Sequence, residues 1–524
     1  MPPTGYKKTN GYDKSPLDAF RSLLAQPAVN WRGDNQYGDL LGDLQANILK
    51  HQDKEYSEYF FITFDPSQTN GVKNWLSRFS EHITSAEEQL RRGHNDKENI
   101  LCIYLTYAGY KYLGIPEGII PPGLAFKMGM TNRVKLDKTQ VQDEFSRAQT
   151  TQPVHVVIMY AYDKDHNDSD TIFASFMEEL AKMDGKYFML KGTTRNPLSP
   201  EYHFAEGIGN PRFFPGTTPY SGKKPFKPSE ISALDLVLVR DNGGNQPLSS
   251  GSYGAFLKLK IDENAINTLI QDNKGKIAAD MLKANIIGRF TDGTPLTLSD
   301  EPTGNATNDF DYTEMVKINQ VNATQSDESG GRCPFHAHIR KANLRRPDTA
   351  KTRIVRRGVF YKESDSEKGL LFMSFQDSLE NKFEFILNNW ILNRYTHYRD
   401  HNQELKEINS GADLLFSQAG DQYDIRPDWN ANQEDKNRQP VKITIPAPMV
   451  VFKGGIYFFA PSKSFFSKLV RPAIATPKSA AKPVFHEFLP GTELKIRPVP
   501  GFKTETPFLP GTQVFLEPDR IDRT

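Results

Sequence analysis

The chain has 524 residues, of which 37% are hydrophobic, 25% charged and 11% aromatic. This length suits two packed domains or one duplicated unit, and the composition is untypical of a disordered or fibrous protein. The formal net charge of +1 provides no overall attraction to nucleic acid or to an anionic membrane surface.

The two cysteines, Cys102 and Cys333, are too few for a disulfide scaffold or a zinc cage, which favours a reducing compartment. Residues 1–26 contain no apolar run typical of a signal peptide, and no stretch approaches the roughly 20 apolar residues of a spanning helix. We therefore expect a cytoplasmic protein that does not enter a membrane. A secreted form whose signal had been removed would show the same features.

The first half of the chain has the pattern of a βαββαβ unit. Its predicted elements, in chain order, are strand 59–64, a helix through 72–79, strands 100–107 and 154–162, a helix through 172–183 and strand 187–190. In the first helix, Val72, Trp75, Leu76 and Phe79 share one face. This order of elements is typical of a ferredoxin-like unit.

The second half repeats this order. Its predicted elements are strands 234–239 and 254–261, a helix over about 263–284, strands 353–361 and 370–375, a helix through 379–390 and strand 449–459. The sequence itself contains no detectable repeat, so the duplication is inferred from the pattern alone. We predict an α+β fold of two ferredoxin-like halves, with antiparallel sheets and peripheral helices.

The predicted domains are an N-terminal extension, two halves and a C-terminal extension. Their bounds are 1–36, 37–230, 231–460 and 461–524, with a polar insertion at 398–445. The last segment holds ten of the 35 prolines and is expected to form irregular or short edge segments.

The segment 330–361 carries the strongest chemical signal. From His338 through Lys362 there are nine Lys or Arg residues and one acid, Asp348, in an otherwise balanced chain. On an extended strand, Arg356 points to the same side as Ile354 and its other apolar neighbours. A guanidinium set into an apolar stripe requires an anionic partner or a function.

Two histidines in this segment are candidate metal ligands. His338 lies in a short apolar stretch, followed by cations that could hold the acidic groups of a cofactor. Neutral imidazole is a standard axial ligand of haem iron. His336 would share the face of His338 on an extended strand, so the residues alone do not choose between them.

Several stretches resemble motifs of the dye-decolourising peroxidase family. CPFHAHIRKANLR, RIVRRGVFY and GLLFMSF are similar to its C-terminal signature, DLQANILK to its opening motif, and HFAEGIGNP to its distal acidic motif. The resemblance implies a fold of the dimeric α/β-barrel type and one haem b per chain. It also implies reduction of hydrogen peroxide and one-electron oxidation of bulky organic substrates such as dyes and phenols.

The resemblance assigns roles to individual residues. His338 corresponds to the proximal iron ligand, and His336 becomes its neighbour. Arg345 corresponds to the arginine that pairs with a haem propionate, although Leu344 replaces the usual proline before it. Arg356, the first of the RR pair, corresponds to the distal arginine.

Further matches concern the walls of the haem site. Leu370 and Phe372 match the apolar residues of the distal side, although a role in the core is equally compatible with them. Asp413 is the candidate carboxylate that orients the imidazole from behind.

The distal acidic motif departs from the family pattern. The family's first glycine and its aspartate are replaced by His203 and Glu206. Glutamate keeps the acid but adds a methylene group, so two outcomes are open: its carboxylate overshoots the position over the iron or reaches it by a bent rotamer. The expected roles are proton transfer by Glu206 and charge stabilisation by Arg356, and His203 is an alternative base.

Two rival functions remain open from the sequence. The altered distal motif is compatible with a haem-binding or haem-transfer protein of weak peroxidase activity. A nucleic-acid-binding module is disfavoured by the balanced charge and by the absence of the RNA-binding signature of ferredoxin-like domains. We expect hydrogen peroxide and an organic reductant as partners, no nucleic acid and no membrane, and leave a homodimer open.

Overall fold

The computed structural model describes ten segments of the chain. They are residues 35–92, 98–134, 145, 153–164, 171–214, 233–313, 316–317, 324–399, 404–426 and 440–470. Residues 1–34 of the predicted N-terminal extension and most of the proline-rich C-terminal segment lie outside these residues. Among the described residues, no helix has both the length and the apolar character needed to cross a membrane.

Both halves contain a four-strand antiparallel unit with the same strand order. The first half has β1 (Tyr56–Thr63), β2 (Ile100–Leu105), β3 (Val156–Tyr162) and β4 (Lys186–Thr193), paired in the order β4-β1-β3-β2. The second half has β6 (Ser250–Ile261), β10 (Val359–Lys362), β11 (Lys368–Gln376) and β16 (Val450–Ala460), paired in the order β16-β6-β11-β10. The prediction of two ferredoxin-like halves is confirmed.

The two halves join into one closed sheet. Phe459 of β16 pairs with Leu105 of β2, and Phe360 of β10 pairs with Thr193 of β4, while β6 also pairs with β11. Every strand of the ring is therefore bonded on both sides, which removes most exposed strand edges. Aromatic and sulfur-containing side chains, among them Tyr59 and Met373, fill the interior of the ring.

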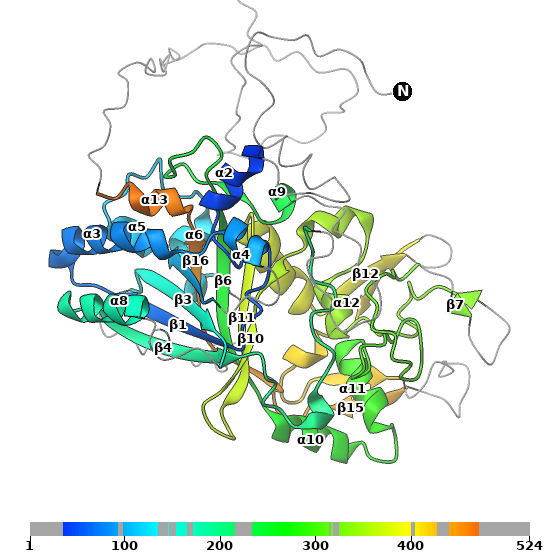
Figure 1. Cartoon of the computed structure of the whole chain (residues 1–524). Coiled ribbons are helices and arrows are strands. Elements are labelled where there is room, and N and C mark those ends of the chain that lie inside the picture. The colour runs from blue at the N-terminus through cyan, green and yellow to red at the C-terminus, as the bar shows by residue number, and fades with distance from the viewer. Residues whose placement is uncertain are drawn as a thin grey trace, which may run out of the picture. The chain divides into compact units, whose positions relative to one another are not determined.

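Helices cover the outer face of the sheet. In Figure 1, α3 (Thr69–Phe79) and α8 (Thr171–Lys182) lie beside the strands of the first half. The predicted face of α3 is buried, and Trp75 stacks on Phe176 of α8 with ring centroids 4.2 Å apart. Burying each such side chain contributes roughly 1.5–3 kcal/mol, which explains why the apolar spacing predicts these helices correctly.

Two predicted elements of the second half are wrong in type or extent. The first half of 234–239 belongs to the helical turn α9 (Ala233–Leu236), and only its last residue belongs to the short strand β5 (Val239–Arg240), because a brief apolar run does not distinguish strand from helix. The helix expected over 263–284 is divided into α10 (Glu263–Asp272) and α11 (Ala279–Ile287). Gly275 between them has φ 84°, a left-handed conformation that ends a helix.

Two further segments differ in detail from the expectation. The strand predicted over 353–361 is interrupted between β9 (Val355–Arg356) and β10. The predicted helix through 379–390 is present but has π-helical turns, η6 (Leu379–Glu384) and η7 (Ile386–Ile391).

The polar insertion at 398–445 contains ordered elements. Its described residues form parts of two hairpins, β12 (Tyr395–Arg399) with β13 (Leu405–Asn409) and β14 (Gln422–Ile425) with β15 (Val441–Thr444). The turn η8 (Leu414–Phe416) lies between the hairpins. Beyond the insertion, α13 (Lys463–Ser467) begins just after β16, so the start of the last predicted domain is helical.

Candidate active site

A cavity of about 870 Å³ lies against the outer face of the second half of the sheet. One wall is apolar and combines strand residues with residues of the π-helical turns, among them Leu259, Phe372, Phe383 and Leu387. Three other segments also line the cavity: the loop 204–213, residues 287–293 at and after the end of α11, and residues 338–345, which begin with a short helix. The volume falls within the roughly 300–1,000 Å³ of ligand pockets.

His338 enters this cavity from the first turn of α12 (His338–Ala342). Its Nδ1 lies 2.7 Å from Oδ2 of the fully buried Asp413. Asp413 is fixed in turn, because its Oδ1 accepts a hydrogen bond from Leu415 N at 3.0 Å. A histidine that donates through Nδ1 presents the lone pair of Nε2, the arrangement that suits a metal ligand.

His336 lies in different surroundings. It is not among the residues that line the cavity, and its ring packs edge-on against Tyr423. Burial lowers the pKa of His336 to about 3, so it is neutral at ordinary pH. The residues before α12 form a turn, so the expected extended strand with both histidines on one face is wrong.

Glu206 lines the cavity from the loop that follows η4 (Pro200–Tyr202). Burial raises the pKa of this carboxyl above that of an ordinary glutamate, and nearby His203 opposes the shift more weakly. The His203 ring is bonded to the Leu198 carbonyl at 2.8 Å and does not line the cavity. Of the two residues that depart from the family motif, only the acid reaches this cavity.

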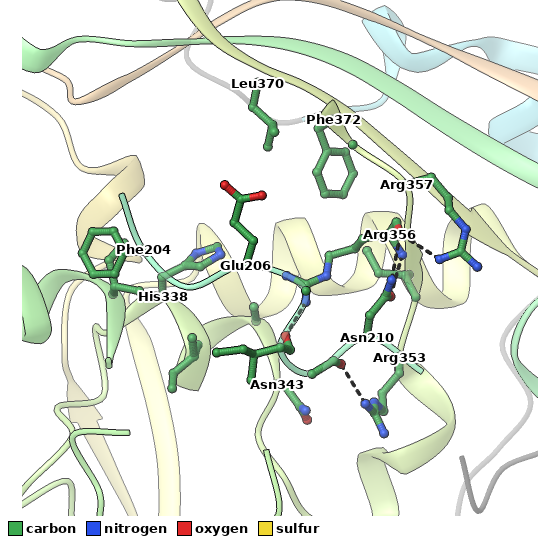
Figure 2. Close-up of a pocket in the computed structure, with 18 of the residues that line it drawn as sticks. Phe204, Glu206, Asn210, His338, Asn343, Arg353, Arg356, Arg357, Leu370 and Phe372 are labelled. Carbon is green, nitrogen blue, oxygen red and sulfur yellow. Dashed lines mark hydrogen bonds between the residues drawn. The ribbon is translucent and has the colours of Figure 1, made fainter. Parts of the chain in front are cut away.

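Arg356 faces the cavity, as the alternation of the strand predicted, together with Ile354 and Phe360. Its guanidinium donates to Ile208 O at 3.0 Å. The side chain of Asn210 binds the Arg356 backbone twice, accepting from its N–H and donating to its C=O, both at 2.9 Å. Figure 2 shows Glu206 and Arg356 extending into the cavity below Leu370 and Phe372 of β11.

Asn210 was missed by the sequence reasoning. Its only signal was its place inside the stretch HFAEGIGNP, which holds the candidate distal acid. Through Asn210 and Ile208, the loop that carries Glu206 is fastened to β9, which carries Arg356.

A cluster of arginines lies at another part of the cavity wall. Arg345 has φ 53° and donates to the backbone oxygens of Asn308 and Phe310, each at 3.0 Å, and to Asn308 Oδ1 at 2.6 Å. Its buried Nε has no hydrogen-bond partner among the described residues. Arg289 and Arg353 also line the cavity and were not predicted.

Packing these cations together has an electrostatic cost. Burial, followed by the charge of Arg345, lowers the pKa of Arg289 to about 9. Burial also lowers the pKa of Arg353, and the charges of Arg345 and Arg356 add to the effect. Such a cluster favours a ligand that carries negative charge.

The side chains around the cavity fit a haem. They supply an imidazole whose second nitrogen is held by a carboxylate, cations with an unpaired donor, and broad apolar walls. The fold is thus an α+β architecture with a closed antiparallel sheet, and the side chains of the cavity suit an acidic, metal-containing cofactor.

Comparison with known proteins points to one family. The model of the Dyp-type peroxidase C-terminal region matches residues 229–412. A dye-decolorizing peroxidase of Exidia glandulosa is 24% identical over 459 residues, covering 80% of this chain and 85% of the relative. The multifunctional dye peroxidase DyP2 of an Amycolatopsis species is 31% identical over 266 residues, 45% of this chain and 53% of the relative.

Solved structures agree with these relatives. The crystal structure of a DyP-type peroxidase from Anabaena has a TM-score of 0.68 at 27% identity, covering 85% of this chain and 98% of that one. The family model, the relatives and the solved structure all indicate the dye-decolourising peroxidase family, whose members are haem enzymes. The resemblance seen in the sequence is confirmed.

Proposed function

We propose that this chain is a haem peroxidase that reduces hydrogen peroxide and oxidises bulky organic substrates, such as dyes and phenols, in one-electron steps. The observation that carries the proposal is the His338–Asp413 pair, at 2.7 Å, beside a cavity that also holds Glu206 and Arg356. The names of the relatives support the same activity.

Haem b, one per chain, is the proposed cofactor. His338 would hold its iron through Nε2, and Asp413 would keep the imidazole oriented and basic. Arg345, with its unpaired Nε, and the neighbouring Arg289 and Arg353 would bind the acidic substituents. When bound, haem supplies an iron that coordinates peroxide and accepts its oxidising equivalents.

Two residues would carry out the protein's part in peroxide cleavage. The Glu206 carboxylate accepts the proton of one peroxide oxygen and returns it to the other, which then leaves as water. The Arg356 guanidinium stabilises the negative charge that develops on the leaving oxygen. The apolar side chains of Leu370 and Phe372 limit the space beside these groups.

Other expectations from the sequence have weaker support. The halves 37–230 and 231–460 are proposed as the two domains, since each contains one complete four-strand unit. The cytoplasmic location and the candidate homodimer stay predictions.

An absorption spectrum and a peroxide titration test the proposed function. The purified protein reconstituted with haem should show a strong Soret band, change its spectrum rapidly with hydrogen peroxide, and then oxidise a phenol or dye catalytically. A Soret band with only slow spectral change and negligible turnover would instead favour the haem-binding or haem-transfer alternative. Absence of haem binding would contradict the proposal entirely.

A further inference from the structure

Arg356 and Arg357 are adjacent residues of the same type, but their guanidinium groups lie in different surroundings. Both residues contribute to the cavity wall, but the Arg356 guanidinium extends into the cavity, whereas the Arg357 side chain turns away from it. Arg357 is only 2% exposed and lies on the same side of the strand as Val355, in the core of the closed sheet. A register shift of one residue would exchange the two faces. Since the side chains are chemically identical, surrounding contacts must decide which arginine faces the cavity.

Arg357 is held by three backbone carbonyl groups. Its Nε donates to Asn47 O at 2.6 Å, one terminal nitrogen donates to Ile48 O at 2.8 Å, and the other donates to Arg356 O at 2.9 Å. Burial lowers the pKa of Arg357 to about 9. A buried cation whose three nitrogens each donate to a backbone carbonyl marks a specified position.

The acceptors come from the stretch DLQANILK, at the start of the described chain. Asn47 has φ 64°, a left-handed conformation that turns the backbone so that two successive carbonyls reach one guanidinium. The Asn47 N–H is fixed by Gln89 Oε1 at 3.0 Å, and the Asn47 side chain contacts Met373 of β11 inside the ring. Contacts from two directions therefore hold Asn47, whose carbonyl and that of Ile48 accept from Arg357.

The interruption between β9 and β10 is fixed from the other side as well. Arg356 O accepts hydrogen bonds from both Asn210 and Arg357, and Arg357 N donates to Met373 O at 2.7 Å. The peptide that joins the two arginines is thus bonded to the side chain of Asn210, to β11 and to the Arg357 guanidinium, which in turn donates to the carbonyls of Asn47 and Ile48. These contacts leave the Arg356 guanidinium directed toward Ile208 and the cavity.

We propose that Arg357, anchored on the carbonyls of Asn47 and Ile48, is a positioning residue that makes Arg356, rather than Arg357 itself, extend its guanidinium into the cavity and that fixes the guanidinium there. This inference rests on the proposed function of Arg356. The stretch DLQANILK, residues 43–50, thereby contributes to the active site, although only Leu49 and Lys50 of this stretch line the cavity.

The substitution Arg357→Lys tests the proposal in the haem-loaded protein. Lysine keeps the charge, but a single ammonium lacks the planar fork that reaches three carbonyls. Displacement of a catalytic group by about 1 Å can cost roughly 10²-fold, so we expect the reaction with peroxide to slow by about 10- to 100-fold. The affinity for fluoride, an anion that would bind beside Arg356, should fall in parallel, as read from the absorption spectrum.

A double-mutant cycle separates positioning from general loss of stability. If Arg357 acts through Arg356, then Arg357→Lys should have little further effect on fluoride affinity in an Arg356→Leu background. Lys258→Met is the matched control, because Lys258 is a buried cation of β6 whose partner is Glu363. It should lower stability and leave fluoride affinity unchanged.

Asn210→Ala is the second variant, because it removes both bonds to the Arg356 backbone without touching Arg357. It should also weaken fluoride binding, and it decides the question if Arg357→Lys does not bind haem. The inference would be overturned if Arg357→Lys bound fluoride as tightly as the wild type. It would also be overturned if the two substitutions weakened fluoride binding independently, so that the fold losses of the single variants multiplied in the double variant. If Arg356→Leu itself leaves fluoride affinity and peroxide reactivity unchanged, it is the proposed function of Arg356 that fails.

Discussion

Two histidines separated by one residue have different chemical capacities in this protein. His338 pairs with a buried carboxylate and lines the cavity, whereas His336 is enclosed by protein and has an Nε2 without a hydrogen-bond partner among the described residues. Position relative to the cavity, rather than residue type, separates the candidate ligand from its neighbour.

Replacing each histidine by alanine tests this distinction. His338→Ala should abolish stable haem binding because the imidazole is lost, and the Soret band is the measurement. His336→Ala should retain the band, although the buried space it leaves should lower stability by about 1–3 kcal/mol. Survival of the band without His338 would contradict the assignment.

The pKa of Glu206 determines a pH dependence. Since burial raises this pKa, the carboxylate that accepts the proton is lost as pH falls, starting at a higher pH than for an exposed glutamate. The rate of reaction with peroxide should therefore decline on the acid side in the wild-type protein. Glu206→Gln should remove this ionisation and slow the reaction by about 10²- to 10⁴-fold.

Glu206→Asp is the control for the pH profile, because it restores the family's residue. It should keep or increase activity and retain an acid limb. If Glu206→Gln reacts as fast as wild type at every pH, Glu206 has a structural role, and His203 would have to move from its bond with Leu198 to serve as the base.

At the scale of elements, the basic segment divides between two environments. Arg345 lies just beyond α12 and reaches the cavity, whereas the adjacent Arg346 is largely exposed and pairs with Asp348 at 3.1 Å. A run of positive charge in the sequence thus contains both site residues and solvated ones. The elements around the run decide which is which.

Arg345→Leu should weaken haem affinity while leaving the axial ligand in place. It removes a charge that would pair with an acidic substituent, a kind of interaction worth about 1.5–3 kcal/mol, or roughly 10- to 100-fold in affinity. Haem transfer to apomyoglobin is a suitable measurement. Arg346→Leu is the matched control and should bind haem normally, and equal retention by both variants would count against the role of Arg345.

At the scale of the described molecule, buried carboxylates join distant parts of the chain. Asp43 accepts hydrogen bonds from the backbone and hydroxyl of Ser464, and from the hydroxyl of Ser249. Asp241 accepts two more from Ser462. The ends of the described chain are thus held together beside the closed sheet.

Asp43→Ala should destabilise the fold markedly. It leaves buried donors from two segments unsatisfied, and hydrogen bonds to charged groups contribute about 1.5–3 kcal/mol each. We expect a loss of at least about 2 kcal/mol in the free energy of unfolding, measured in urea. Asp39→Ala, at an exposed position in α2 (Asn35–Asp43), should change it by less than about 0.5 kcal/mol.

The sequence by itself determined the features that depend on local periodicity. The alternation in 353–361 placed Arg356 on the cavity side, and the spacing of Trp75 and its neighbours predicted α3, because these patterns reflect which face of one element is buried. The order of the elements also gave the two ferredoxin-like halves, and the motifs indicated the family.

Only the tertiary structure decided which distant residues meet. Asp413 is 75 residues from His338, and Asn210 is 146 residues from Arg356, so no local pattern records either contact. The closure of the sheet and the arrival of Arg289 at the cavity follow likewise from packing between the halves. The break after Arg356 coincides with the hydrogen bonds of Arg357 to carbonyls more than 300 residues earlier, which local propensity does not encode.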